Sequence, residues 1–435
     1  MNGGNSTWQN WARSVAVTPA RIERPGSTDE LQLAVKRAAA AGLKIKAVGA
    51  GHSFTGIAAA PDVLLDLDRL QGVVGVDPGL QRVRFHAGTR LHRIPGLLAE
   101  HNLAMPNLGD IDRQSLAGAM STGTHGTGAG FGGLSAQVAG LTLVQPDGGL
   151  LTVSDGDPLL PAAALGLGAL GIIADITLQC VPAFALRAEE RSVPLEGVME
   201  GLADRVKSTD HFEFYWFPHT GRAATKSNTR LPGTEALRPL TPVSRWIDES
   251  LLSNSVFRAT CAAGTAVPAL VPAVNKVAAR LLGGRSYTDE SHRVFTQRRT
   301  VRFREMEYGI PAEHLPGAFT ALRQLVEDRG WRISFPVEVR WAAADDRWLS
   351  TAYGRDSAYI AVHRYYREDC REYFDAVEEI MLAHGGRPHW GKLHSLTAAA
   401  LAPRYDRFDD FLAVRNRLDP DRLFANAYLD RVLGP

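Results

Sequence analysis

A charged pair, Glu338 and Arg340, stands in an otherwise apolar run, FPVEVRW, at residues 335–341. We expect this run to form a strand, in which residues two positions apart face the same side. A carboxylate and a guanidinium held side by side can bind a polyhydroxylated molecule, and Arg340 can stabilise negative charge that develops on an oxygen. An ion pair on the surface of an edge strand would have the same spacing, so the motif alone leaves both interpretations open.

A second cluster, RPHWGK at residues 387–392, combines a histidine with a lysine. A partly desolvated Lys392 can have a lowered pKa and act as a base, or it can serve as a fixed positive charge. His389 can approach a bound ring system or act as a structural hydrogen-bonding group. Taken alone, the cluster is more typical of an ordinary loop than of a site.

A glycine-rich stretch, AVGAGHSFTG at residues 47–56, follows an alternating run at 43–48 that predicts a strand. Glycines let the backbone turn sharply and approach a ligand closely. Their free N–H groups can form a nest for an anion such as a diphosphate. The candidate cofactor-binding residues in this stretch are Gly49, Ala50, Gly51, His52 and Ser53.

Two other interpretations of this stretch fit less well. A Rossmann fingerprint needs a third glycine at the position where Phe54 stands. A hydrolase nucleophile elbow needs a glycine where Thr55 stands, and it would make Ser53 a reactive nucleophile. The remaining interpretation is a flavin-binding loop.

A second glycine-rich stretch, GAMSTGTHGTG at residues 118–128, also contains a histidine. Two phosphate-binding loops in a mixed α/β chain suit a dinucleotide held between two small lobes. His125 either contacts that cofactor or braces the turn. The candidate residues in this stretch are Gly118, Ser121, Thr122, Gly123, His125 and Gly126.

Helices and strands must position these motifs. A capping box at residues 27–30 predicts a helix through Ala41, and Thr89 is expected to cap a helix that reaches about His101. Residues 141–145 and 150–153 predict a hairpin around PDGG. The motif strand at 333–341 is preceded by a predicted helix at 316–329 and followed by a strand at 358–365 and a helix at 368–385. An aromatic strand, FEFYWFP at 212–218, is expected to contribute mainly to the core.

The overall composition argues against several classes of protein. Lys and Arg total 48 and Asp and Glu total 47, so the basic excess typical of nucleic-acid binders is absent. We find no secretion signal pattern, and the longest apolar run, at 159–174, is interrupted by proline and glycine. These features predict a soluble, cytoplasmic protein with no integral membrane segment.

Neither the cysteines nor the histidines predict a metal site. Three cysteines, Cys180, Cys261 and Cys370, are far apart and suggest buried thiols rather than a disulfide framework. A clustered histidine set, His384, His389 and His394, is spaced by five residues and does not share one helical face. We therefore expect no metal.

Taken together, the motifs resemble a known family along nearly the whole chain. They comprise both glycine loops, the ExRW and HWGK motifs, the aromatic strand and the tail DPDRLFANAYLD at 419–430. The pairing of the loops resembles the vanillyl-alcohol oxidase (PCMH) type of FAD-binding fold. Within it, the chain is similar to the aldonolactone oxidoreductases, which include gulonolactone and arabinonolactone oxidases. Alditol oxidases are close relatives.

This resemblance implies an α+β fold with a particular division of the chain. Residues 1–182 would form a two-lobed FAD-binding domain, and residues 183–390 would form an α/β cap domain for the substrate. Residues 391–435 would return to the FAD domain. The stretch at 166–179 would contact the flavin and would place Ile173 at the cofactor.

The resemblance also assigns roles to residues. His52 would carry the FAD covalently, the Glu338 and Arg340 pair would lie at the catalytic centre, and Lys392 would lie at the substrate. Gly109, in NLGDID, stands where a glycine permits oxygen to reach the reduced flavin and an alanine hinders it. His389 is a further catalytic candidate.

The expected reaction is oxidation of a secondary hydroxyl of a gulono-, galactono- or arabinono-1,4-lactone. The hydride would pass to flavin N5, and O2 or another acceptor would take the electrons. Oxidation of a sugar alcohol is the alternative with the same residues. A non-catalytic protein that binds flavin or sugar on the same fold is the alternative of another class.

Overall fold

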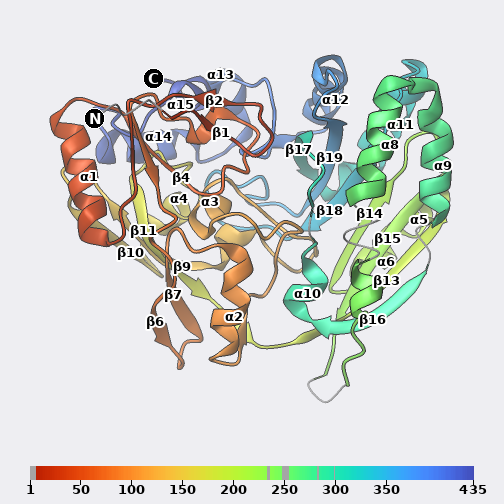
Figure 1. Cartoon of the computed structure of the whole chain (residues 1–435), viewed down its shortest axis with the longest axis horizontal. Helices are drawn as coiled ribbons and strands as arrows, with labels where there is room; N and C mark the ends of the chain where they lie inside the picture. Colours follow the sequence, from red (N-terminus) through yellow and green to blue (C-terminus); the bar gives the residue numbers. More distant parts are fainter. Residues whose placement is uncertain (1–5, 233–235, 247–253, 282–283, 298) are drawn as a thin grey trace.

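The computed structural model describes residues 6–232, 236–246, 254–281, 284–297 and 299–435. It consists of an N-terminal part, to which the C-terminal helices return, and a second part built on one large sheet (Figure 1). No helix in the described part of the chain is long and apolar enough to cross a membrane.

The N-terminal part contains a small parallel sheet in the order β3-β5-β4. Its strands are β3 (Arg21–Glu23), β5 (Val63–Asp66) and β4 (Ile45–Val48). The connecting helix α1 (Thr28–Ala40) begins at the predicted capping box, where the Ser27 side chain accepts a hydrogen bond from the Glu30 N–H. This strand–helix–strand unit delivers β4 directly to the first glycine loop.

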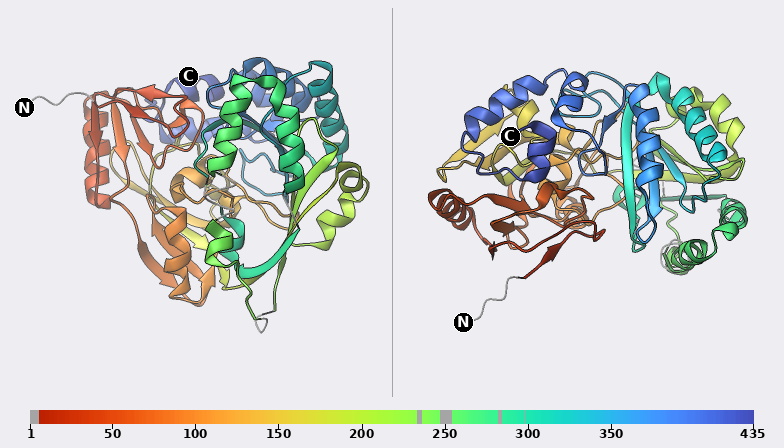
Figure 2. Two further views of the ribbon diagram at one scale, coloured as in Figure 1. Left: turned by 45° about the vertical axis from the view of Figure 1, so that its right-hand side comes forward. Right: turned by 90° about the horizontal axis from the view of Figure 1, so that it is seen from above.

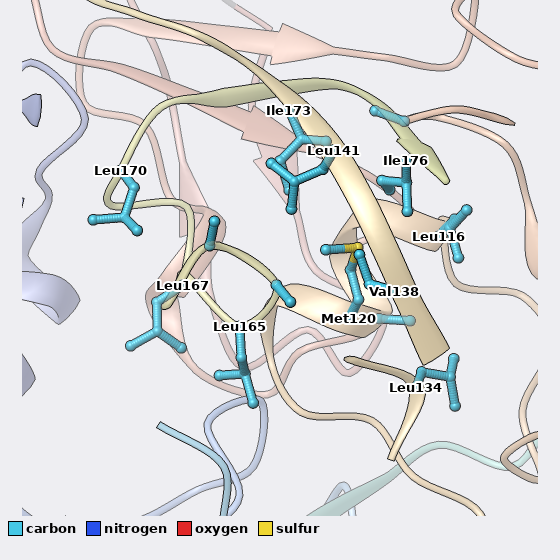
Figure 3. Close-up of a cluster of buried hydrophobic side chains, with 14 of the residues drawn as sticks. Leu116, Met120, Leu134, Val138, Leu141, Leu165, Leu167, Leu170, Ile173 and Ile176 are labelled. Atoms are coloured by element: carbon cyan, nitrogen blue, oxygen red, sulfur yellow. The ribbon is translucent and has the colours of Figure 1, made fainter. Parts of the chain in front are cut away.

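A five-stranded antiparallel sheet, in the order β10-β9-β11-β7-β6, forms the rest of this part. Its strands are β10 (Leu150–Ser154), β9 (Val138–Val144), β11 (Ile172–Gln179), β7 (Arg82–His86) and β6 (Val73–Asp77). The short helix α3 (Leu116–Ser121) lies against it, and Met120 of the helix packs beside Leu141 and Ile176 of the sheet (Figure 3). This core holds the second glycine loop.

An eight-stranded antiparallel sheet organises the second part, in the order β16-β13-β15-β14-β18-β19-β17-β20. Its strands are β16 (Arg285–Glu290), β13 (Ala185–Pro194), β15 (Arg222–Arg230), β14 (His211–Trp216), β18 (Val337–Ala342), β19 (Ser357–Tyr365), β17 (Phe303–Pro311) and β20 (Arg387–Pro388). Side chains on one face pack against α11 (Leu315–Asp328) and α12 (Arg371–Ala383) in a single core.

The helices α8 (Phe257–Ala266) and α9 (Val271–Leu281) form an antiparallel pair on the large sheet's other side (Figure 2). Some of their side chains line the large cavity described below. The sheet and this helical pair therefore enclose space between them.

The C-terminal tail packs against the N-terminal part. The helices α14 (Phe408–Leu418) and α15 (Ala427–Leu433) contribute to the same core as α1 and β9. Asn426 caps α15 by accepting from the Leu429 N–H, and its amide nitrogen donates to the carbonyls of Gly56, Ile57 and Ala59. One side chain thus fastens the end of the first glycine loop. The domain limits at 182 and 390 stay predictions.

Some predicted element boundaries were wrong. Thr89 does not cap a helix; its hydroxyl bonds to the His86 carbonyl, and a 3-10 turn precedes α2 (Ile94–Ala99). Pro95 explains the late start, because proline is tolerated only in a helix's first turn. The strand expected from Ile333 begins at Val337. A short helix, α7 (Pro242–Trp246), follows β15, and residues 247–253 lie outside the described residues.

We predict that Asn426→Asp destabilises the protein. The carboxylate keeps the acceptor for the Leu429 N–H but loses the donor that satisfies three loop carbonyls. Each buried carbonyl left without a donor costs about 1–3 kcal/mol. A thermal melt should show a lower midpoint, whereas Asn416→Asp, at an exposed position of the same tail, should leave it unchanged. Equal midpoints for both variants would contradict this anchoring role.

Candidate active site

Two cavities meet between the two parts of the molecule. The larger has a volume of about 840 Å³ and the smaller about 110 Å³. Four residues line both cavities: His52, Ser53, Gln114 and Thr122. A ligand bound across this junction would reach from the glycine loops to the face of the large sheet.

The first glycine loop borders the smaller cavity with all five of its candidate residues. A Cβ on Gly49 would lie 1.9 Å from the Ser115 Oγ, so only glycine fits there. Ser115 is the N-cap of α3, and its hydroxyl accepts from the Gly118 N–H. Gly51 has a φ of +66°, which L side chains rarely adopt. The two loops are therefore in direct contact, and together they form a backbone cradle.

The candidate residues of the second glycine loop do not all line the same cavity. Gly118, Ser121 and Thr122 line the smaller cavity, as does Ile173 of β11, and His125 lines the larger one. Gly123 and Gly126 line neither described cavity. A Cβ on Gly126 would lie 2.2 Å from the Leu108 carbonyl oxygen, so this glycine permits close backbone packing.

Gly109 lines the larger cavity close to the second loop. A Cβ placed on it would lie 3.1 Å from the His125 carbonyl oxygen and 3.5 Å from the Thr124 side chain. An alanine would therefore press on the backbone of this loop as well as narrow the cavity.

His52 lies at the junction with a neutral ring. It stacks on Trp11, with ring centroids 5.6 Å apart. Burial lowers the pKa of His52 to about 4, and the positive charges of Arg90, Lys392 and Arg113 add to this effect. The imidazole is consequently unprotonated at neutral pH and has a free lone pair.

Arg340 is bound between two carboxylates on the floor of the larger cavity. Its guanidinium donates to Glu213 at 2.9 Å and forms an ion pair with Glu338. The Tyr215 hydroxyl donates to Glu338 at 3.1 Å. The pairing of β14 with β18 sets this geometry, because it places Tyr215 directly opposite Glu338.

The aromatic strand β14 places alternate side chains on the two faces of the sheet. Phe212, Phe214 and Trp216 are buried in the core, as expected, while the intervening Glu213 and Tyr215 line the cavity. This alternation is the period of two that a strand imposes.

The electrostatics of this group favour a carboxyl that can exchange a proton. Burial raises the pKa of Glu338, the Arg340 charge opposes this rise, and the Glu213 charge adds to it. The two carboxylates outweigh the effect of burial on Arg340, whose pKa stays well above its usual value. Arg340 is therefore a permanent cation beside a carboxylate with raised proton affinity.

Lys392 is held by a buried carboxylate, Glu305 of β17. Burial alone would raise the pKa of Glu305, but Lys392 and His363 outweigh it and hold it at about 2. His363 lies 3.5 Å from the same carboxylate. An ion pair of this kind favours the alternative in which Lys392 serves as a fixed positive charge.

A second buried carboxylate, Glu307, lies two residues further along β17. His125 Nε2 lies 3.3 Å from it, and the His125 ring stacks on Tyr359 with centroids 3.7 Å apart. His125 thus braces the loop against the sheet at the edge of the larger cavity.

His389 accepts a hydrogen bond from the Gly391 N–H, and burial lowers its pKa to about 3.

The histidines considered from the sequence do not form one cluster. His384 bonds to the Ile380 carbonyl and His394 to the Tyr428 hydroxyl. Ligand atoms of His125, Glu307 and His389 lie within 4.8 Å of one another. His125 Nδ1 lies 2.8 Å from the Gly126 carbonyl oxygen and its Nε2 lies 3.3 Å from Glu307, so both of its ring nitrogens already have polar neighbours.

Five further residues contribute to the cavity and were not predicted from the sequence: Glu213, Tyr215, Glu305, Glu307 and His363. A local signal existed for two of them, because Glu305 and Glu307 alternate with apolar residues in FREMEYGIP. Such alternation places two carboxylates on one face of a strand. Their partners, however, come from distant segments.

Solved structures share this architecture. A cholesterol oxidase from B. sterolicum superimposes with a TM-score of 0.84, covering 99% of this chain and 96% of its own, at 19% identity. Residues 19–154 match a family described as FAD binding domain. The glycine cradle and its cavity fit a diphosphate-containing cofactor. The chain therefore has an FAD-binding fold of the vanillyl-alcohol oxidase (PCMH) type joined to a sheet-based second part.

Residues 176–432 match the D-arabinono-1,4-lactone oxidase family. The L-gulono-1,4-lactone dehydrogenase of Mycobacterium tuberculosis is 43% identical over 98% of this chain and 99% of its own length. The L-gulonolactone oxidase of Bos taurus is 32% identical over 98% of both chains. An alditol oxidase of Streptomyces sp. is also 32% identical over 98% of both. The chain belongs to the aldonolactone oxidoreductase family, as its motifs predicted.

We predict that Gly49→Ala reduces the fraction of protein that carries flavin. The added methyl would overlap Ser115, and overpacking of this kind costs about 1–3 kcal/mol, or roughly tenfold to hundredfold in binding. The ratio of flavin to protein absorbance measures the effect. Gly96→Ala is the matched control, because a Cβ there meets no atom within 4 Å. Full flavin content in Gly49→Ala would contradict the cradle.

Proposed function

We propose that this protein is an FAD-dependent oxidoreductase that oxidises a secondary hydroxyl of an aldono-1,4-lactone. One observation carries the proposal: the cavity bordered by the glycine cradle opens, at His52, into the cavity lined by Glu338, Arg340 and Lys392. Membership of the family and the names of its members support the lactone as substrate.

Residues of this chain would bind the substrate and move one proton. Arg340 and Lys392 provide two fixed positive charges that attract the substrate's hydroxyl oxygen and stabilise negative charge on it. A Glu338 carboxylate oxygen would accept the hydroxyl proton, helped by its raised pKa. Bound FAD supplies the hydride acceptor, its N5 atom.

We further propose that His52 holds the FAD covalently. The support is its position at the junction of the two cavities and its neutral ring, since an unprotonated nitrogen is the nucleophilic form. The attachment would fix the flavin between the two loops and the sheet.

The electron acceptor in this proposal is O2 or another oxidant, because the relatives include both oxidases and a dehydrogenase. The small residue Gly109 in the cavity wall supports access for oxygen. The proposed location is the cytoplasm, and the three buried free cysteines suit a reducing compartment.

Alditol oxidation is the second candidate, supported by the alditol oxidase relative. Steady-state turnover on L-gulono-1,4-lactone and on xylitol, with oxygen and with an artificial dye as acceptors, separates the two. Higher kcat/KM for the lactone supports the first proposal. No turnover on either by the flavin-loaded protein would favour a non-catalytic binding protein.

We predict that the pH profile reports on Glu338. Activity should fall as the pH drops through the raised pKa of Glu338, since a protonated carboxyl cannot accept the hydroxyl proton. In Glu213→Gln the acidic limb of kcat/KM should move to lower pH, because one of the charges that raise this pKa is gone. Glu338→Gln should lower kcat by about 10²–10⁴-fold.

Glu189→Gln serves as the control, because Glu189 is exposed and pairs with Arg191. Its profile should match that of the wild type. If the acidic limb of the kcat/KM profile does not move in Glu213→Gln, the role of Glu338 as the base is contradicted.

We predict that the flavin stays with the protein after acid precipitation. The yellow colour should remain in the wild-type pellet and appear in the supernatant of His52→Ala, since that variant lacks the bonding nitrogen. The visible absorbance of the pellet and of the supernatant measures how the flavin is divided between them. Colour in the wild-type supernatant would exclude the bond while leaving the FAD-binding fold intact.

A further inference from the structure

The charges at Arg340 continue across the large sheet in a single row. The strand register places Arg285 of β16 opposite Glu190 of β13, and Glu190 opposite Lys226 of β15. Lys226 stands opposite Glu213 of β14, which is the carboxylate bound to Arg340 of β18. Positive and negative side chains therefore alternate across five neighbouring strands.

The row runs from the rim of the cavity to its centre. Arg285 and Glu190 form an ion pair at 2.6 Å, with side chains 26% and 19% exposed. Arg340 and Glu213, at the other end, are 12% and 9% exposed. Lys226 lies between them and is buried. Its ammonium group, which has three N–H donors, donates a hydrogen bond to the Val294 carbonyl oxygen at 2.7 Å. We call these five residues the charged row.

In the part of the chain that the structure describes, the charged row forms the floor of the larger cavity. All five of its members line the larger cavity. The opposite wall comes from α8 and α9 and is largely apolar, with Phe257, Val271, Val274 and Ala278. Four strand spacings of about 4.8 Å make the floor roughly 19 Å long. A single lactone ring bound at Arg340 would cover only one end of it.

The chemistry of these two walls selects the kind of molecule that can fill the space. An apolar ligand would take water from the charged floor without replacing its hydrogen bonds, which is costly. A sugar unit has hydroxyl groups at its edges for Lys226 and Glu190, and apolar C–H faces for the aliphatic wall. A polyhydroxylated extension of the substrate therefore matches both walls.

We propose that the outer part of the cavity is a second sugar subsite, and that the protein oxidises aldono-1,4-lactones that carry a further sugar unit. This proposal rests on the proposed function of the same cavity. The reacting hydroxyl stays with Glu338, Arg340 and Lys392. The added unit lies over Lys226, Glu190 and Arg285, which bind it and take no part in the oxidation.

The test compares L-gulono-1,4-lactone with the same lactone carrying a hexopyranosyl group on O6. The wild type should have the higher kcat/KM for the glycosylated lactone. Glu190→Gln and Arg285→Gln should each lower kcat/KM for it about tenfold, because each removes a charged hydrogen-bond partner of the added sugar. Their kcat/KM for the simple lactone should stay within about twofold.

Glu189→Gln is the matched control, since Glu189 precedes Glu190 on β13 and points to the other face. Binding is also measured without turnover, by calorimetry in a Glu338→Gln background. There, adding Glu190→Gln should weaken binding of the glycosylated lactone alone. Thermal melts and flavin content establish that each variant is folded.

Three results would overturn the proposal. The first is a lower kcat/KM for the glycosylated lactone than for the simple one. The second is an equal loss of kcat/KM on both lactones in Glu190→Gln. The third is a loss of kcat/KM for the glycosylated lactone in Glu189→Gln that equals the loss in Glu190→Gln. Failure of the proposed function is distinct from these, because then neither lactone would reduce the enzyme.

Discussion

The Arg340 guanidinium, bound between Glu213 and Glu338, is the interaction on which the site depends. A buried cation is tolerated only when anions and hydrogen bonds replace its water. Here Glu338 comes from β18 itself and Glu213 from the neighbouring β14, so the register of these two strands sets the geometry of the site. The rest of the large sheet keeps those strands in place, and the same arrangement gives Glu338 its raised proton affinity.

The N-terminal part depends on close backbone contacts rather than on charge. Gly49 against Ser115 brings the two glycine loops together, and Gly126 against Leu108 brings the second loop close to the segment before it. The tail fastens this arrangement from outside, because Asn426 holds the first loop and Lys46 donates to the carbonyls of Gly168 and Phe424. The proposed cofactor cradle and the proposed substrate floor therefore meet at His52.

Local patterns in the sequence predicted the parts of the site that lie close together along the chain. The spacing of Glu338 and Arg340 placed them on one face, and the glycines indicated where the backbone must come close. The partners of these residues were not predictable in the same way. Glu213 meets Arg340, and Glu305 meets Lys392, only through strand pairings between distant segments. For Lys392 this pairing favours the role of a fixed charge over that of a base.

The most direct test of this account is reduction of the bound flavin without oxygen. The purified yellow protein is mixed anaerobically with L-gulono-1,4-lactone while the visible spectrum is recorded. We expect rapid bleaching of the flavin band in the wild type, slowed by orders of magnitude in Glu338→Gln and Arg340→Met although both keep their flavin. An unbleached wild type, or bleaching at the same rate in both variants, would contradict the assignment of this cavity as the place of oxidation.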